Sequence, residues 1–209
     1  MIKIRQDFDK KHEIREKVIT LLRESLINSK SAVNAVHNKD GNTAKLKLEK
    51  TKETIEKTKN LLEPFPDLHI GMKYLSFQEF TEASILYEVI FQNNFVTPED
   101  LGVSALSYLM GIADSIGEFR RSVLDSLRHD KVGEAEKTLE IMEKLFAELA
   151  SMESAQSLES NLRRKIDVAR RILEVTRGDV TTEIRREQLK RAMTSLEKKL
   201  NKDLSQQRS

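Results

Sequence analysis

The sequence predicts an all-α protein, an elongated bundle of about six to seven long antiparallel helices. Apolar residues return at the three-and-four spacing of a buried helical stripe through most of the chain, and no segment shows the alternation of a strand. A content of 38% hydrophobic and 33% charged residues suits helices that bury one stripe and keep the rest solvated. With 3 prolines, 7 glycines and no tryptophan, the composition is unlike that of a β-sandwich or barrel.

Turn-forming residues divide the first half of the chain into three long predicted helices. These helices are expected over residues 6–37, 43–63 and 76–93. The connection at residues 38–42 contains Asn, Asp and Gly, which accept left-handed conformations, and Thr43 after it is a suitable N-cap. Two prolines in segment 64–66 end the second helix, and Ser76 is the expected N-cap of the third.

Four further helices are predicted in the second half of the chain, over residues 98–128, 133–149, 153–176 and 181–200. The first of them begins with Thr97 as N-cap and Pro98 at the first helical position, and it extends for roughly 48 Å. Gly178 is expected to close the third as a left-handed C-cap. Together the helices predict one domain over residues 1–200, followed by a flexible tail at 201–209.

The composition also excludes several classes of site. The chain has 0 cysteines, which excludes disulfides, thiolate zinc sites and thiol catalysis. No histidine lies three positions after a glutamate, so the pattern of di-iron bundles is absent. The charged N-terminus is unlike a signal peptide, and no apolar run is long enough to span a bilayer. We therefore expect a cytoplasmic protein with no membrane partner.

Two pairs of acidic residues are spaced so that each pair shares one face of a helix. Glu79 and Glu82 are three residues apart, and Asp114 and Glu118 are four residues apart. If the two helices pack against each other, the four carboxylates converge, and clustered oxygen ligands suit Mg²⁺ or Mn²⁺. With 34 acidic residues in the chain, such pairs also arise by chance on solvated faces.

The surroundings of Asp114 favour the first interpretation. This residue lies in an otherwise apolar, small-residue stretch that contains Gly111 and Gly117. A glycine inside a helix costs about 1 kcal/mol relative to alanine, which suggests close helix approach at both positions. Charges in such a place are expected to be partly enclosed and to need a partner.

The first helix carries the candidate nucleic-acid contacts, which are Lys11, Arg15, Arg23, Lys30 and His37. Arg23, Lys30 and His37 are spaced seven residues apart and therefore share a face. Such a basic line is able to follow a phosphate backbone. An ordinary solvated face is the alternative, and a net charge of +2 does not decide between them.

Three segments resemble the translin/Trax family. Residues 108–121, YLMGIADSIGEFRR, are similar to the most characteristic helix of that family, and residues 79–83, EFTEA, match a second. Residues 23–37 resemble its basic first helix, although Ser31 and Asn38 replace the usual residues there, and Ser107 replaces an aspartate before the central segment. The resemblance covers about residues 6–178.

The resemblance implies a bundle of about seven helices that assembles into a closed, hollow homo-octamer with RNA bound inside. Trax-type subunits of this family are Mg²⁺-dependent endoribonucleases, and their acidic cluster corresponds to Glu79, Glu82, Asp114 and Glu118. Translin-type subunits lack the full set. Because this chain keeps all four acids, it looks Trax-like, and its short form is similar to the single-subunit archaeal members.

These observations lead to a predicted metal-dependent endoribonuclease that cleaves single-stranded or unpaired RNA. Glu79, Glu82 and Asp114 are expected to hold Mg²⁺ or Mn²⁺, and Glu118 to serve as a further ligand or as the base that orients water. A non-catalytic shell that binds RNA or single-stranded DNA is the second hypothesis. A helical scaffold without affinity for nucleic acid is the third.

Overall fold

The structure is a computed structural model that describes residues 1–206, with side chains described as far as Asn201. Within that part of the chain every regular element is a helix, which confirms the all-α prediction. The elements are α1 (Ile2–His37), α2 (Gly41–Leu62), α3 (Gly71–Tyr87), the π-helical turn η1 (Glu88–Gln92), α4 (Pro98–Leu101), α5 (Ala105–Arg128), α6 (Val132–Ser151), α7 (Glu153–Leu158) and α8 (Ser160–Gln206).

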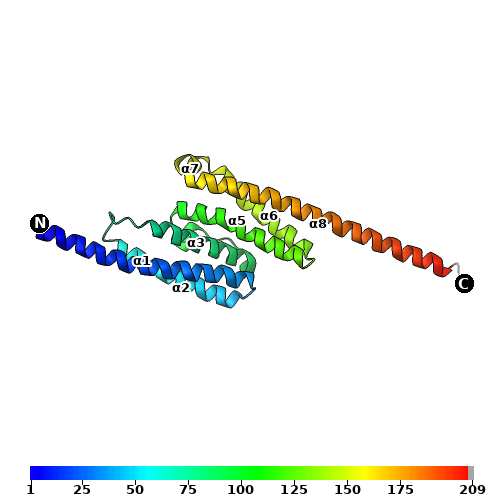
Figure 1. Cartoon of the computed structure of the whole chain (residues 1–209), viewed down its shortest axis with the longest axis horizontal. Coiled ribbons are helices and arrows are strands. Elements are labelled where there is room, and N and C mark those ends of the chain that lie inside the picture. The colour runs from blue at the N-terminus through cyan, green and yellow to red at the C-terminus, as the bar shows by residue number, and fades with distance from the viewer. Residues whose placement is uncertain (207–209) are drawn as a thin grey trace.

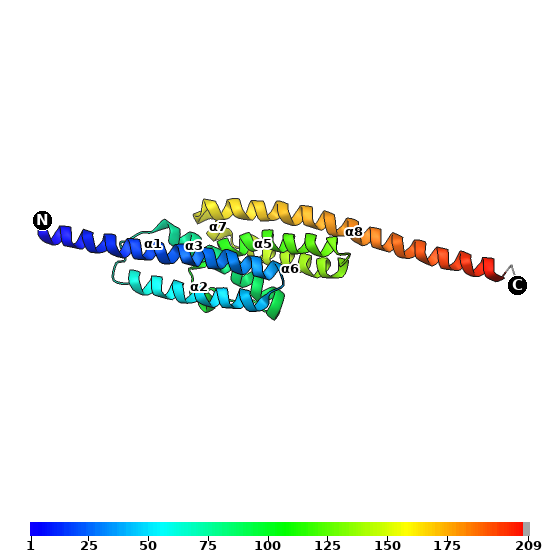
Figure 2. The ribbon, with the colours of Figure 1, turned by 60° about the horizontal axis from the view of Figure 1, so that its bottom comes forward.

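The long helices form an elongated bundle (Figures 1 and 2). Helices α1 and α2 make an antiparallel pair at one side, and α3 packs on α1 and on α5. Helices α6 and α8 pack on α5 and on each other. The N-terminal end of α1 and the C-terminal part of α8 project from opposite ends of the bundle (Figure 1).

A single cluster of apolar side chains joins these helices. Its largest fully buried members include Leu22 of α1, Phe80 of α3, Phe119 of α5 and Ile166 of α8. Each recurs with other buried residues at helical spacing, which is the periodicity seen in the sequence. Helices α3 and α5 lie at the centre of the bundle. Their polar faces lie between α1 and α8 and carry the four candidate acids, Glu79, Glu82, Asp114 and Glu118.

The helix predicted over residues 98–128 is wrong as a single element. Its start is correct, because Thr97 and Asp100 form a capping box in which each side chain accepts a hydrogen bond from the other's backbone amide. Gly102 then adopts a left-handed conformation with φ of 62°, which ends α4 after Leu101. Ser104 caps α5 anew by accepting a hydrogen bond from the amide of Ser107.

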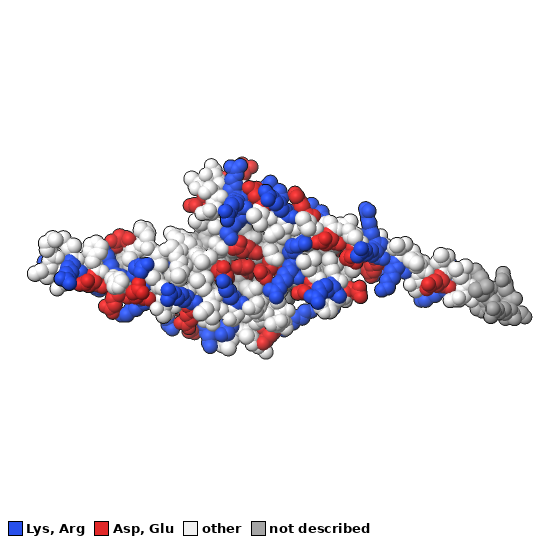
Figure 3. All heavy atoms as spheres, in the orientation of Figure 1, with Lys and Arg blue, Asp and Glu red and all other residues white. Residues whose placement is uncertain are grey.

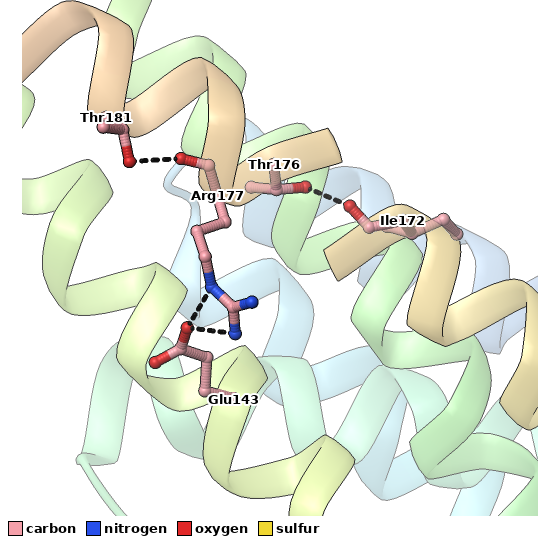
Figure 4. Close-up of polar contacts among 5 residues, drawn as sticks. All are labelled: Glu143, Ile172, Thr176, Arg177 and Thr181. Carbon is pink, nitrogen blue, oxygen red and sulfur yellow. Dashed lines mark hydrogen bonds and ion pairs between the residues drawn. The ribbon is translucent and has the colours of Figure 1, made fainter. Parts of the chain in front are cut away.

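The predicted C-cap at Gly178 is also wrong, because α8 continues through it and includes the helix expected at 181–200. Both neighbours of Gly178 are anchored to the bundle: Arg177 donates two hydrogen bonds to Glu143 of α6, and Asp179 forms an ion pair with Arg120 of α5. The hydroxyl of Thr181 donates to the Arg177 carbonyl within the helix (Figure 4). These contacts hold the helical conformation on both sides of the glycine.

Other predicted boundaries shift by a few residues. Helix α2 begins at Gly41 with Asp40 as its N-cap, and Thr43 donates its amide to the Asp40 side chain. Helix α3 begins at Gly71, so Ser76 is a buried helical residue and not a cap. The segment predicted as one helix over 153–176 is divided between α7 and α8. Helix α8 continues through residues 201–206 of the predicted tail, and residues 207–209 lie outside the described residues.

Gly178 allows the continuity of α8 to be tested. A β-carbon added there meets no atom within 4 Å. We expect Gly178→Ala to raise the free energy of unfolding by about 0.5–1 kcal/mol, because alanine restricts the unfolded chain and favours the helix. Urea denaturation followed by circular dichroism measures this change. A loss of stability instead would contradict the continuous helix.

Gly111 lies at a crowded position of α5, so the same substitution is expected to have the opposite effect on stability there. A β-carbon there would lie 2.6 Å from Cβ of Thr81 and 2.8 Å from the Gln78 carbonyl oxygen, so α5 and α3 approach closely at this point, as predicted. Gly111→Ala is expected to lower the free energy of unfolding by about 1–3 kcal/mol in the same assay. The prediction of close approach at Gly117 is wrong, because nothing lies within 4 Å and this residue faces the acidic pocket.

Candidate acidic site

All four candidate acids line one open pocket of about 680 Å³ between α1, α3, α5 and α8. Helix α3 contributes Glu79 and Glu82, and α5 contributes Asp114 and Glu118. The close contact at Gly111 places the two helices side by side, and the helical spacing within each pair turns both carboxylates toward the same space. The structure therefore brings together residues that are far apart in the sequence.

Basic side chains border the same pocket. Its lining includes Lys30 of α1, Arg121 of α5 and the pair Arg164 and Lys165 of α8. On the face drawn in Figure 3, acidic side chains gather near the middle of the bundle and basic side chains border them. The small net charge of the chain therefore conceals a local segregation of the two signs.

Asp114 is held by partners from two helices. The ammonium group of Lys165 forms an ion pair with Oδ1 of Asp114, and the Gln78 side-chain amide donates to Oδ2 at 2.5 Å. Lys165 thus links α8 to α5 through a charge-assisted hydrogen bond. Half-buried carboxylates need such partners, as the sequence had suggested for this residue.

Glu118 has a different partner. Its Oε2 lies 2.5 Å from Nε2 of His37, whose side chain is only 4% exposed, and 3.9 Å from the guanidinium of Arg121. The hydrogen bond with His37 lowers the pKa of Glu118 below its ordinary value, and the nearby positive charge of Arg121 acts in the same direction. Glu118 is therefore ionised at neutral pH.

Glu79 and Glu82 lie in a less favourable environment for a negative charge. Burial, followed by the negative charges of Asp114, Glu79 and Glu118, raises the pKa of Glu82 to about 8. Burial also raises the pKa of Glu79, although Lys30 opposes this effect. The pocket thus contains one carboxylate held ionised and one that takes up a proton near neutral pH.

The donor chemistry fits a hard divalent cation, because four carboxylates face one pocket and their mutual repulsion is only partly compensated. Among the described residues, however, no three acidic or histidine side chains are grouped closely enough to hold a metal ion as they stand. Asp114 is instead paired with Lys165, and Glu118 with His37. A cation held by all four acids would have to displace these partners.

The predicted basic residues divide into two groups. Lys30 lines the pocket and His37 contacts Glu118, so the end of the basic line reaches the acids. Arg23 is exposed on α1 outside the pocket lining. Lys11 instead pairs with Asp7 and Asp67 at 2.8 Å each, and Arg15 pairs with Glu16 at 2.7 Å. The structure does not bring these last two to the acidic site.

Sequence reasoning missed several residues of the site. Lys165 and Arg164 belong to the basic run at residues 163–165, which was a detectable signal without an obvious partner. Gln78 was adjacent to Glu79 in the sequence, but its bond to Asp114 depends on how α3 packs on α5. These residues entered the site through tertiary contacts alone.

Comparisons with known proteins give relatives along most of the chain. No family model matches it. The uncharacterized protein MJ0175 of Methanocaldococcus jannaschii is 35% identical over 192 residues, which span 89% of this chain and 85% of that protein. Within residues 1–206, no helix combines the length and apolar character needed to cross a membrane.

Three solved structures are similar to the fold. AfC3PO is 31% identical with a TM-score of 0.80, and the match covers 87% of this chain and 95% of the AfC3PO chain. AfC3PO in complex with duplex RNA is 30% identical with a TM-score of 0.80, over 87% and 94% of the two chains. The apo form of NeC3PO is 24% identical with a TM-score of 0.79, over 87% and 95%, and supports the fold alone.

Proposed function

We propose that this chain, which belongs to the C3PO family of translin-like helical proteins, binds RNA at the acidic pocket and cleaves it with the help of a divalent cation. The observation that carries this proposal is the meeting of four carboxylates from two helices in one pocket bordered by four basic side chains. The AfC3PO complex with duplex RNA supports RNA as the ligand class. The substrate is single-stranded or unpaired RNA, and the assembly is a hollow homo-octamer of the Trax type.

The basic border orients the RNA. Lys30, Arg121 and Arg164 line the pocket, and each provides N–H donors that bind phosphate oxygens. Neutralising phosphates releases counterions, so the affinity is expected to fall steeply with salt. If Asp114 binds a cation, the Lys165 ammonium group that pairs with it would become available to bind a phosphate of the RNA.

Glu79, Glu82, Asp114 and Glu118 would hold Mg²⁺ or Mn²⁺. The chemistry supplied by such a cation is Lewis-acid stabilisation of the charge that develops on the phosphate during hydrolysis. Glu118 is kept ionised by His37 and faces the pocket, so it is suited to accept a hydrogen bond from the attacking water. His37, almost fully enclosed, fixes the orientation of that carboxylate.

A non-catalytic shell that binds RNA or single-stranded DNA is the second candidate. The specific observation in its favour is that Asp114 and Glu118 already have basic partners in Lys165 and His37. In that case the acids are structural, and RNA affinity does not depend on a divalent cation. Cleavage assays with and without EDTA distinguish the two candidates.

Binding is tested first without cleavage. In EDTA, we expect Lys30→Glu and Arg164→Glu each to weaken the binding of a labelled RNA and to reduce the salt dependence, by about one unit of the log–log slope for each phosphate that is no longer neutralised. Fluorescence anisotropy over a range of salt concentrations measures both effects. Lys57→Glu, a change of the same charge at an exposed position of α2 outside the pocket lining, is the control.

An equal loss of affinity in the Lys57 control would indicate that only the total charge matters. Unchanged affinity in the Lys30→Glu and Arg164→Glu variants would show that RNA does not bind at this pocket.

A further inference from the structure

Gly117 leaves an opening in the wall of the acidic pocket. It lies inside α5, directly before Glu118, and a β-carbon added there meets no atom of the described residues within 4 Å. Gly111 on the same helix differs, because α3 packs closely against it. A glycine inside a helix costs about 1 kcal/mol relative to alanine. Close packing of helices accounts for the glycine at position 111, but not for the one at position 117.

The opening lies between two contacts that join α5 to α8. Lys165 of α8 forms an ion pair with Asp114, three residues before Gly117. Arg120, three residues after Gly117, donates a hydrogen bond to the hydroxyl of Thr176 of α8 at 2.8 Å. The two contacts hold the helices together at both ends of a short stretch, and Gly117 contributes no side chain within it.

The pocket lining along this stretch is apolar. Val168 and Ile172 line the pocket from α8, three and seven residues after Lys165, so they share one face of that helix. Val168 is 48% exposed. Ala113 lines the pocket from α5, one turn before Gly117. We call Ala113, Gly117, Val168 and Ile172 the apolar patch.

We propose that one unpaired nucleobase of the RNA lies flat against the apolar patch, beside the phosphate that is cleaved. This inference rests on the proposed function and names the part of the RNA that this side of the pocket recognises. The aliphatic side chains contact the face of the base, and the missing side chain at Gly117 leaves room for a flat ring. A base within a duplex has both faces covered by its neighbours, so only a base that has left the stack fits there.

Basic residues at both ends of the patch favour a nucleotide as its occupant. Arg164 lines the pocket four residues before Val168, and Arg121 lines it four residues after Gly117. Each guanidinium group provides N–H donors that suit phosphate oxygens. A ligand with an uncharged flat ring and a phosphate on either side matches this order of side chains. An apolar peptide segment would offer nothing to either guanidinium group.

Substitution of Gly117 tests the patch in a binding assay that needs no cleavage. The probes are a labelled single-stranded RNA and an abasic strand of the same length and charge, and fluorescence anisotropy is measured in EDTA. The unmodified chain is expected to bind the RNA more tightly than the abasic strand. Gly117→Val should weaken RNA binding by about tenfold, the effect of a misfit of this size in a pocket, and leave the abasic strand unaffected. Circular dichroism checks that the variant folds.

Two matched controls lie on α8. Gly178→Val makes the same change at a helical glycine where a β-carbon also meets no atom of the described residues within 4 Å, outside the pocket lining. Val168 and Val175 are 48% and 55% exposed, but only Val168 lines the pocket. We expect Val168→Ser to lose affinity for the RNA alone. Gly178→Val and Val175→Ser should bind both probes as the unmodified chain does.

Equal loss of affinity for both probes in Gly117→Val, or no loss for either, would overturn the base contact. If Lys30→Glu and Arg164→Glu still weaken both probes in that case, RNA remains assigned to the pocket and the patch alone is refuted. If those two variants bind both probes normally, the proposed function itself fails. Loss of RNA affinity in Gly117→Val and Val168→Ser, with both controls unchanged, would support the base contact.

Discussion

Replacement of Asp114 with asparagine should reduce divalent-cation-dependent RNA cleavage by about a hundredfold to a thousandfold, the loss found when one electrostatic group is removed from a preorganised site. Asp114 is the central acid, since its charge acts on both Glu79 and Glu82 and its side chain contacts Lys165 and Gln78. Asparagine has the same shape but only one oxygen for the two donors, Lys165 and Gln78, so it also loses the ion pair with Lys165. The loss of cleavage should therefore be much larger than any loss of stability, and folding is checked separately.

A matched control lies on the same helix. Asp125 of α5 pairs with Arg128 at 3.7 Å and is absent from the pocket lining. Asp125→Asn is expected to retain cleavage, because it removes the same charge at a distance from the site. Initial rates on a labelled single-stranded RNA, with RNA affinity in EDTA as the check of folding, measure both variants. Full activity in Asp114→Asn would show that the acidic pocket is not the catalytic site.

The second large expected effect is a fall in the stability of the metal-free chain as the pH rises. The pKa of Glu82 is about 8 in the folded chain against an ordinary value of 4.5, so between these values the folded state binds a proton that the unfolded state releases. Stability should therefore be highest below about pH 4.5 with respect to this group, and should fall as pH rises toward 8. The slope is at most about 1.4 kcal/mol per pH unit for one proton.

Urea unfolding in EDTA across this pH range measures the slope. Glu82→Gln should flatten the profile, because glutamine has no charge to bury and no proton to release. Mg²⁺ should raise the stability of the unmodified chain more at pH 8 than at pH 6, since protons compete with the cation at Glu82. A profile equally steep in Glu82→Gln would assign the pH dependence to another group.

Glu118 acts in the opposite direction and in another pH range. The hydrogen bond with His37 lowers the pKa of Glu118 below 4.5, so its contribution to stability is present above that value and disappears in acid. The two glutamates therefore titrate on different sides of the ordinary glutamate pKa. Measurements between pH 5.5 and 8.5 avoid the range in which Glu118 titrates, and the difference between the unmodified chain and Glu82→Gln then isolates the contribution of Glu82.

Most of the helices could be predicted from the sequence, because a helix depends on local apolar periodicity and on capping residues near its ends. Thr97 is the N-cap that the sequence predicted, and it forms a capping box with Asp100, since both residues lie within one turn of each other. Gly102 and Gly178 were misjudged in opposite ways. Gly102 is free to take the left-handed conformation that ends α4. Gly178 is held in a helix by contacts of Arg177 with α6 and of Asp179 with α5, and sequence alone does not reveal such contacts.

The candidate site was predictable in part for the same reason. The spacing of Glu79 with Glu82 and of Asp114 with Glu118 followed from helix geometry, and the translin/Trax resemblance joined the two pairs. Lys165 contacts Asp114 across 51 positions, and His37 contacts Glu118 across 81. No local pattern encodes these partners, because they depend on how α1 and α8 pack around α5.

The most direct test of an RNA-cleaving acidic pocket is incubation of the purified chain with labelled single-stranded RNA in Mg²⁺ and in EDTA, beside a Glu82→Ala variant. We expect cleavage in Mg²⁺ that EDTA abolishes and that Glu82→Ala lacks, with RNA binding retained in all samples. Binding without cleavage in every condition would contradict the nuclease and leave a shell that binds RNA, in which the four acids are structural partners of the surrounding basic residues.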